Sequence, residues 1–331
     1  MHFKSNLTKI ILAWYDNNKR NLPWRVSKYS HKKIYYRILS EFMLQQTQVK
    51  TVLPYFNKFV KKYPTLKSLS KAKEKDIMKL WEGLGYYRRA RNLLATTKII
   101  SKGKNNIPKN FEDFKKLPGI GDYTANALLA FIYNKPRLAF DGNVKRIFSR
   151  LLYKKEDTIN FKKLAEKNKD NFFKFKRNSD LAEAFIEFGA LICKSKNPEC
   201  LGCPLKNNCK YFKSSKQINL KSINKFSKEK DYDIFCHINK KKQIALTKSN
   251  QLGFLKTFFL PVVKEKSKKK KQDWNYLESY KHSISNKRLK LNLYYKFSNQ
   301  IPRNFQWQSL KNNEEFIPSF TKKIFYKLRN L

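Results

Sequence analysis

The sequence predicts a mainly α protein that ends in a small α+β domain. Apolar residues recur at helical spacing through about the first 200 positions, without the alternation typical of strands. A linker rich in Ser, Lys and Asn follows at 213–230, and the residues after it alternate in the manner of β-strands. A chain of 331 residues is long enough for two or three domains. We therefore expect a helical region over 1–212 and an α+β domain over 231–331.

The helical region begins with an amphipathic helix within residues 1–20. Its apolar face consists of Leu7, Ile10, Ile11 and Trp14. The stretch 22–25, Leu-Pro-Trp-Arg, is a rigid entry into the next segment. That segment has a helical pattern again from Tyr35 to about Lys61.

Glu41 lies among apolar residues of this second segment. On the solvent-facing side of the helix it would be an ordinary surface carboxylate. Facing a cleft, it would lose hydration, which raises the pKa of a carboxyl group and keeps it protonated near neutral pH. A protonated carboxyl group in a cleft can act as a general acid. The spacing alone leaves both interpretations open.

Residues 80–89 place two tyrosines and two arginines directly after a glycine turn. Exposed aromatic side chains beside cations suit insertion into, or stacking on, nucleic acid bases. Packing in a core is the alternative for each aromatic residue.

Residues 111–133 predict a helix, a tight turn and a second helix, because Pro118 and Gly119 interrupt the apolar periodicity. Gly119 and Gly121 have no Cβ, so the turn can adopt positive φ and its N–H groups can approach an anion. A DNA phosphate suits such a site, and an ordinary helical hairpin is the alternative. Asp122 fits an anion site only if its side chain caps the second helix.

Asp141 stands between an apolar run at 138–140 and a new helix at 144–152. This position is typical of a helix N-cap. Capping and catalysis are compatible, because we expect a carboxylate at a helix start to keep a low pKa and stay charged.

Four cysteines cluster with the spacing C-x6-C-x2-C-x5-C. They are Cys193, Cys200, Cys203 and Cys209. Such a cluster in a reducing compartment favours a metal site over disulfides. Either zinc or an iron–sulfur cluster fits four close thiolates. Lysines surround these ligands, so a structural metal could present them to DNA phosphates.

The net charge of +48 predicts a polyanionic partner, and nucleic acid is the first choice. A composition rich in lysine throughout is the alternative explanation. No apolar run near the N-terminus is long enough for a signal peptide or a membrane span. We therefore expect a cytoplasmic protein that does not enter membranes.

The α+β domain shows four short strand-like runs, at 232–238, 243–247, 257–260 and 289–295. Cys236 lies in the first run and is expected to be a buried free thiol. The basic stretch 264–271 is interpreted as a solvated loop.

Taken together, the helical motifs resemble those of adenine DNA glycosylases of the MutY type, within the helix-hairpin-helix superfamily that includes endonuclease III. Six motifs occur in one order over most of the first 212 residues. They are L-P-W-R, S-E-x-M-L-Q-Q-T-Q-V, W-x-G-L-G-Y-Y-x-R-A-R-N, L-P-G-I-G-x-Y-T-A, D-G-N-V-K-R and the four-cysteine loop. The resemblance implies a two-lobed fold, with a helical domain at 22–135 and a cluster-bearing domain from 1–21 plus 136–212.

The resemblance implies a monomeric base excision repair enzyme that removes adenine mispaired with 8-oxoguanine or guanine in double-stranded DNA. Glu41 matches the acid that protonates the flipped-out base, and Asp141 matches the carboxylate that stabilises the oxocarbenium-like sugar. The matches to residues that enter the helix around the lesion are Gln46 and Tyr86. The matches to contacts with oxidised guanine are Thr47 and Leu84. Those to the adenine pocket are Arg25, Tyr123 and Glu183. The four cysteines match a 4Fe-4S cluster.

Tyr123 stands where bifunctional relatives carry a lysine. Strand cleavage through a Schiff base needs an amine, so the resemblance implies a monofunctional glycosylase that uses water as its nucleophile. Lys145, one helical turn past Asp141, leaves weak lyase activity open.

The C-terminal domain resembles the Nudix-type domain of this family, which reads the oxidised base. No R-E-x-x-E-E run follows residues 252–256, so we expect no nucleotide hydrolysis. The family's F-S-H loop matches residues 282–289, where Ser285 is kept but Ile284 and Asn286 replace Phe and His. Asn286 can still donate and accept hydrogen bonds.

Two alternatives remain. One is an endonuclease III-like glycosylase and lyase that acts on oxidised pyrimidines, which Tyr123 and the extra C-terminal domain disfavour. The other is a catalytically silent, basic DNA-binding module. Glu41 and Asp141 disfavour it, because binding alone has no use for two carboxylates beside phosphates. For the enzyme we expect a bacterial, nucleoid-associated location.

Overall fold

The structure is a computed structural model that describes residues 6–27, 29–103, 107–214, 229–248, 252, 255, 258–267, 271–284, 287–301, 303–311, 317–329 and 331. The chain divides into two compact units. The first consists of residues 1–80 and 87–223, and the second of residues 81–86 and 224–331. The predicted finer domain boundaries stay a prediction.

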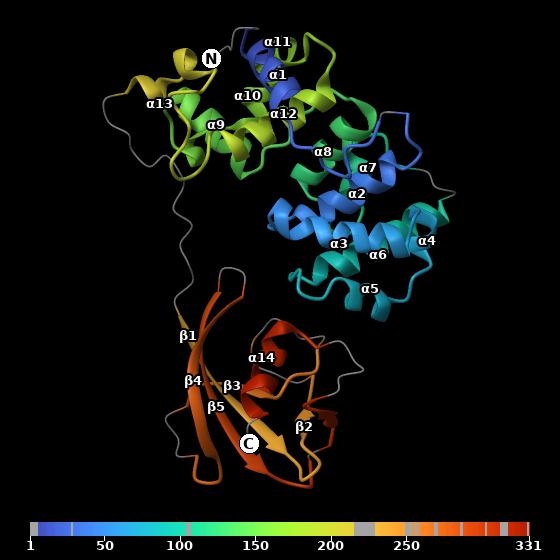
Figure 1. The fold of residues 1–331 in the computed structure, drawn as a ribbon, viewed down its shortest axis with the longest axis vertical. Helices are drawn as coiled ribbons and strands as arrows, with labels where there is room; N and C mark the ends of the chain where they lie inside the picture. Colours follow the sequence, from blue (N-terminus) through green and yellow to red (C-terminus); the bar gives the residue numbers. More distant parts are fainter. Residues whose placement is uncertain are drawn as a thin grey trace. The chain divides into compact units, whose positions relative to one another are not determined.

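The first unit is helical (Figure 1). Its α-helices are α1 (Asn6–Asn18), α2 (Lys33–Leu44), α3 (Val49–Lys62), α4 (Leu66–Ser70), α5 (Glu74–Leu80), α6 (Arg88–Lys102), α7 (Phe111–Lys115), α8 (Asp122–Tyr133), α9 (Gly142–Leu152), α10 (Phe161–Lys167), α11 (Lys169–Phe173), α12 (Asn178–Leu191) and α13 (Lys210–Lys213). Short 3-10 turns η1 (Glu156–Thr158) and η2 (Lys206–Asn208) complete it. The mainly α prediction is therefore confirmed for this part.

Helix α12 is central to the helical unit, because it contacts α1, α8 and α9. Its apolar side chains enter a core with α1 and α9, in which Phe185 packs 5.1 Å from Phe148 between ring centroids. Burial of these aromatic rings stabilises the arrangement of the helices that carry the polar site. Residues from the first and last parts of the unit are thus held together around one helix.

The helical segment expected from Tyr35 to about Lys61 is in fact two helices, α2 and α3. They are separated at residues 45–48, where Gln46 adopts a φ of 55°. A left-handed residue ends an α-helix, and apolar periodicity does not reveal it. The predicted helix within 1–20 and the helix after Asp141 are confirmed as α1 and α9.

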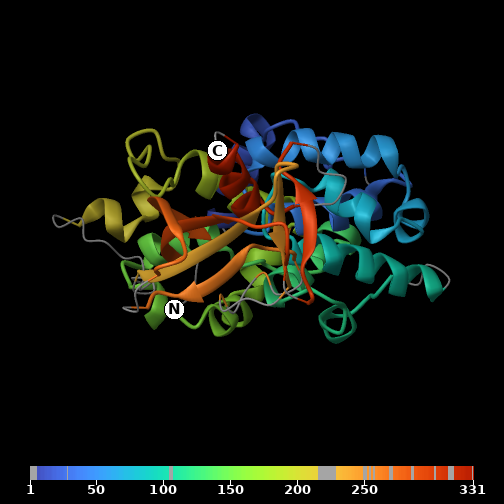
Figure 2. The ribbon, with the colours of Figure 1, turned by 90° about the horizontal axis from the view of Figure 1, so that it is seen from below.

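The second unit contains a six-stranded sheet. Its strands are β1 (Lys230–Ile238), β2 (Gln243–Leu246), β3 (Val262–Glu265), β4 (Asn275–Ile284), β5 (Lys287–Phe297) and β6 (Gln306–Ser309). The order is β4-β5-β1-β2-β6, with β3 also paired to β1. Only the β1–β5 pair among these is parallel, and the paired strands lie side by side in Figure 2.

Helix α14 (Ser319–Leu328) packs against β4. Phe320 lies 5.6 Å from His282 between ring centroids, and Lys327 pairs with Glu278 at 2.6 Å. The α+β prediction is confirmed for the described residues of this unit. Among the described helices of the whole chain, none has both the length and the apolar character needed to cross a membrane.

Three of the four predicted strand runs are confirmed, as β1, β2 and β5. In the fourth, 257–260, only Leu260 pairs, through an isolated bridge to Thr247. In the stretch 264–271, residues 264–267 are exposed as expected, but Lys264 belongs to β3 and not to a loop. Lys271 is not a solvated lysine, because it pairs at 2.6 Å with the buried Asp233. Ser285, with Asn286, lies outside the described residues.

Candidate active site

Glu41 faces the interior of the helical unit, not solvent. Glu41 is 4% exposed, and its Oε2 atom has no hydrogen-bond partner. Burial raises the pKa of Glu41 to about 7, although the nearby Arg37 cation lowers it. Of the two interpretations that the sequence left open, the structure supports burial, and the solvent-facing alternative is wrong.

Tyr123, in the first turn of α8, donates a hydrogen bond from its hydroxyl group to the Glu41 carboxylate. Burial, and then the negative charge of Glu41, raise the pKa of Tyr123 well above its usual value. The phenol therefore stays neutral and remains a donor at any physiological pH.

Asp141 is the N-cap of α9, as predicted. Its Oδ1 accepts a hydrogen bond of 2.7 Å from the Val144 amide, and its Oδ2 accepts one of 3.1 Å from Asn143. The prediction of a low pKa is wrong. Burial raises the pKa of Asp141 more than these hydrogen bonds lower it. A cap position visible in the sequence does not show how deeply the carboxylate lies.

Glu183 on α12 is the centre of a buried ion network. Its carboxylate pairs with Arg37 and with Arg25, the latter at 2.5 Å, and accepts a 2.5 Å hydrogen bond from the Tyr15 hydroxyl. Arg25 also pairs with Glu187 at 2.7 Å. Buried charges of this kind are stable only when paired, so the network fixes these side chains in place.

Three members of this network were not predicted as site residues: Tyr15, Arg37 and Glu187. Arg37 precedes Glu41 by four residues, and Glu187 follows Glu183 by four. This spacing places each pair on one face of its helix, and it is the signal that could have identified them.

The structure brings together Glu41, Tyr123, Asp141 and Glu183, since each of the other three affects the pKa of Glu41. They come from α2, α8, the start of α9 and α12. Tyr123 also packs against a cluster of small and aromatic side chains. Its buried members are Ala127, Ala130, Phe131, Ala139 and Ala182. The result is a polar group with one apolar wall, in which one carboxyl group is protonatable and another accepts hydrogen bonds.

The turn after α2 presents the exposed Gln46 and the half-buried Thr47. The buried Arg89 holds this turn, because its guanidinium donates to the carbonyls of Met43 at 2.6 Å and Gln45 at 2.5 Å. A third bond, of 3.0 Å, reaches the Thr47 hydroxyl oxygen. These bonds support the left-handed backbone at Gln46, which is costly for a residue with a side chain.

Residues 81–86, in the second unit, contain Leu84 and Tyr86. Leu84 is 5% exposed and Tyr86 is 40% exposed. Tyr86 has a φ of 50° and directly follows Gly85, which also has a positive φ, as does Gly83. Both Gln46 and Tyr86 thus stand exposed on left-handed backbone.

The predicted hairpin is present between α7 and α8. Gly119 has a φ of 79°, and a Cβ there would lie 2.7 Å from the Asn92 side chain, so glycine is required. Gly121 is the N-cap of α8 and has open space around it. Asp122 does not cap the helix. The capping condition set for a phosphate site is therefore not met; the Asp122 carboxylate pairs with Lys115 instead, and this cation offsets its negative charge.

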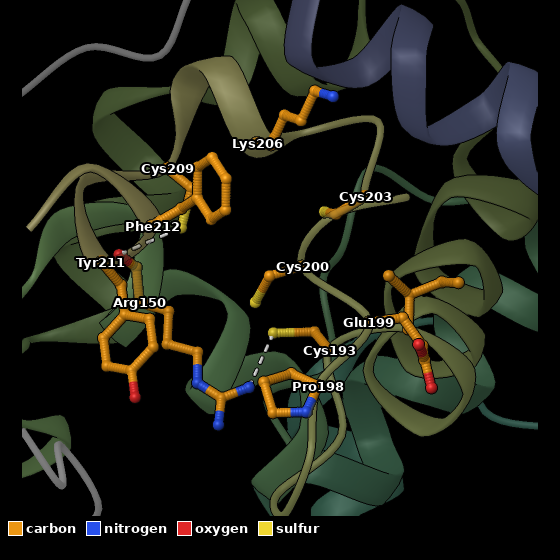
Figure 3. Close-up of a pocket in the computed structure, with 11 residues that line it drawn as sticks. Arg150, Cys193, Pro198, Glu199, Cys200, Cys203, Lys206, Cys209, Tyr211 and Phe212 are labelled. Carbon is orange, nitrogen blue, oxygen red and sulfur yellow. Dashed lines mark hydrogen bonds between the residues drawn. The ribbon is translucent and has the colours of Figure 1, made fainter. Parts of the chain in front are cut away.

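The four predicted metal ligands line one pocket. Figure 3 shows the sulfur atoms of Cys193 and Cys200 pointing toward one another. Arg150 donates to Cys193 Sγ at 3.3 Å. Within the described residues, no three His, Cys, Asp or Glu side chains lie close enough to hold a single metal ion. Cys236 is buried in β1, as predicted.

Known proteins resemble this chain over most of its length. The model of the HhH-GPD superfamily of base excision DNA repair proteins matches residues 39–172. The chain is 35% identical to an adenine DNA glycosylase of Buchnera aphidicola subsp. Baizongia pistaciae, over 96% of this chain and 95% of that protein. It is 34% identical to the human adenine DNA glycosylase, over 60% of this chain and 38% of the human protein.

A solved structure of a thermostable thymine-DNA glycosylase is also similar. It has a TM-score of 0.56 and 24% identity, over 63% of this chain and 95% of that one. This likeness concerns the fold alone.

Proposed function

The chain belongs to the adenine DNA glycosylases of the HhH-GPD superfamily, and we propose that its substrate is adenine mispaired with 8-oxoguanine or guanine in double-stranded DNA. It is an adenine DNA glycosylase of base excision repair, which hydrolyses an N-glycosyl bond in damaged DNA. The buried carboxyl group of Glu41, with its unpartnered Oε2, is the observation that supports the catalytic assignment most strongly.

Glu41 is proposed as the general acid. A carboxyl group with a pKa of about 7 is about half protonated at neutral pH and largely protonated below it, and its unpartnered Oε2 can donate to a ring nitrogen of adenine. Protonation makes the base a better leaving group. The target base must first be flipped out of the DNA stack to reach a buried acid.

Asp141 is proposed to stabilise the positive charge that develops on the sugar as the bond breaks. Its carboxylate is held by the Val144 amide and the Asn143 side chain, so it needs no reorganisation during the reaction. One neutral and one charged carboxyl group are the combination that cleavage of a glycosidic bond requires.

Tyr123 supports a monofunctional mechanism. A phenol held as a hydrogen-bond donor to Glu41 cannot form a Schiff base, so water is the proposed nucleophile. Arg25 and Glu183, which are ion paired beside this group, are proposed to line the adenine pocket.

The cysteine pocket is proposed to hold a 4Fe-4S cluster. Four thiols that line one pocket are the donor set that such a cluster requires. Because each thiolate would bind a different iron, the four sulfur atoms need not lie as close together as they would around a single metal ion. The ligands would be Cys193, Cys200, Cys203 and Cys209. The bound cluster would be structural. The guanidinium of Arg150, already hydrogen bonded to Cys193, would offset its negative charge.

DNA binding is proposed to use the hairpin amides and two exposed side chains. The N–H groups around Gly119 and Gly121 would bind a backbone phosphate, which the net charge of +48 favours. Gln46 and Tyr86 would enter the helix around the mispair, with Thr47 and Leu84 contacting the oxidised guanine. The C-terminal unit is proposed to be a Nudix-like domain that reads this base, and the enzyme to act as a monomer.

A single-turnover assay tests this function. Duplexes with one adenine opposite 8-oxoguanine, guanine or thymine are incubated with excess enzyme, and strand breaks are scored with and without alkali. We expect breaks at the adenine only after alkali, fastest opposite 8-oxoguanine. No breaks at adenine, with spontaneous cleavage at an oxidised pyrimidine in a control duplex, would overturn the proposal.

A further inference from the structure

Arg37 lies next to the proposed acid but has no role in the mechanism above. It stands four residues before Glu41 on α2, so the two side chains share one face of the helix. The residue is 6% exposed. Its guanidinium lies 5.0 Å from the centroid of the Phe131 ring and pairs with Oε1 of Glu183.

A buried guanidinium one helical turn from a carboxyl group is a problem for an acid catalyst. Charges interact strongly where water is excluded, and a cation favours the ionised form of a neighbouring carboxyl group. An uncompensated Arg37 would therefore convert Glu41 into a carboxylate, which cannot donate a proton to adenine.

Glu183 supplies the compensation. Its carboxylate reaches Arg37 from α12 across 146 positions of sequence. It is held in this place by Arg25 and by the Tyr15 hydroxyl. Arg37 and Glu183 act on the pKa of Glu41 in opposite directions, since Arg37 lowers it and Glu183 raises it.

Each element packed against Glu41 can be considered in turn. Tyr123 faces it from α8 and Asp141 from the start of α9. From α6, Arg89 binds carbonyls at the end of α2. Helix α3 buries only apolar side chains there, namely Val52, Phe56 and Phe59. Glu183 faces Glu41 from α12 and pairs with both Arg37 and Arg25, and Arg37 is the one of these two cations that shares a helix with the proposed acid.

We propose that Arg37 is a positioning residue for adenine excision, and that its ion pair with Glu183 leaves Glu41 protonated when adenine is bound. This inference rests on the proposed function of Glu41. It assigns Glu183 a second task besides lining the adenine pocket, and it explains why a buried cation is tolerated so close to an acid.

The test is the pH dependence of the single-turnover excision rate at saturating enzyme, where the alkaline limb reports loss of the proton from the acid in the DNA-bound state. The variants are Arg37→Met, Glu183→Gln and the double variant. Glu183→Gln removes the negative charge that offsets the Arg37 cation, so the alkaline limb of the excision rate should move to lower pH. Arg37→Met removes it, so the limb should move to higher pH. The double variant should return towards the wild type.

Opposite shifts of the alkaline limb in Arg37→Met and Glu183→Gln cannot come from a general loss of packing. A loss of packing would lower the fraction of active enzyme, and so the amplitude of excision, in both variants. Arg37→Lys keeps the cation and is expected to retain the wild-type limb. If Arg37→Met does not fold, a downward shift in Glu183→Gln together with an unchanged limb in Arg37→Lys supports the proposal. Shifts of the same sign, or none, in variants that still bind the duplex would overturn it. Wild-type protein that excises no adenine would instead refute the proposed function.

Discussion

The hydroxyl group of Tyr123 donates a hydrogen bond to the buried carboxylate of Glu41, and so connects α8 to the proposed acid on α2. The bond stabilises the ionised form of Glu41, whereas burial, the largest influence, raises its pKa to about 7. Tyr123 therefore lowers the pKa of the proposed acid. It also occupies the position at which a lyase would need an amine.

Replacement of Tyr123 by Phe should extend excision to higher pH. Excision requires protonated Glu41, so the wild-type rate should fall as pH rises through about 7. Loss of the hydroxyl donor removes a bond to the carboxylate, which raises the pKa of Glu41 further. The alkaline limb of the single-turnover rate should move upward. A limb that moves downward, in a variant with unchanged DNA affinity, would contradict the role assigned to this bond.

Gly119→Ala and Gly121→Ala should have different effects. Gly119→Ala places a Cβ on backbone with a φ of 79° and 2.7 Å from the Asn92 side chain. This substitution should lower the free energy of unfolding by about 1–2 kcal/mol or more. At Gly121 a φ of −93° suits alanine and the space is open, so stability should change by less than about 0.5 kcal/mol.

DNA affinity separates the two roles of the hairpin. A methyl group at Gly121 should obstruct the approach of a phosphate and weaken duplex binding while the melting temperature stays that of the wild type. Unchanged affinity in this variant would mean that no phosphate binds at the hairpin.

Cys200→Ser should lower the iron content and the visible absorbance of the purified protein. Cys200 lines the pocket that contains the other three proposed ligands. Cys236→Ala is the matched control, because Cys236 is buried in β1 of the other unit. Iron analysis of both variants decides the assignment. Full iron in Cys200→Ser, or equal loss in Cys236→Ala, would argue against a cluster held by these four residues.

The sequence revealed those features that depend on near neighbours. Helical spacing around Glu41, the glycine turn before α8 and the cap position of Asp141 all extend over a few residues. The structure bears out each of them. The strand run that became β1 is visible for the same reason, since apolar alternation is a local pattern.

Features that arise from distant parts of the chain were missed. The Arg37–Glu183 pair joins α2 to α12, and no short sequence motif indicates that these two residues are in contact. The pKa of Asp141 was expected to be low from its cap alone, but burial by other elements outweighs the cap. Strand β4 was not predicted because its residues are mostly half-exposed or exposed and show no apolar alternation.

The most direct measurement is the single-turnover excision rate of Glu41→Gln on a duplex with adenine opposite 8-oxoguanine, taken together with its affinity for that duplex. Glutamine keeps the size of the side chain but has no acidic proton. We expect the rate to fall by about 100-fold or more with affinity unchanged, because general acid catalysis contributes at least that factor. Excision at the wild-type rate would show that Glu41 is not the acid.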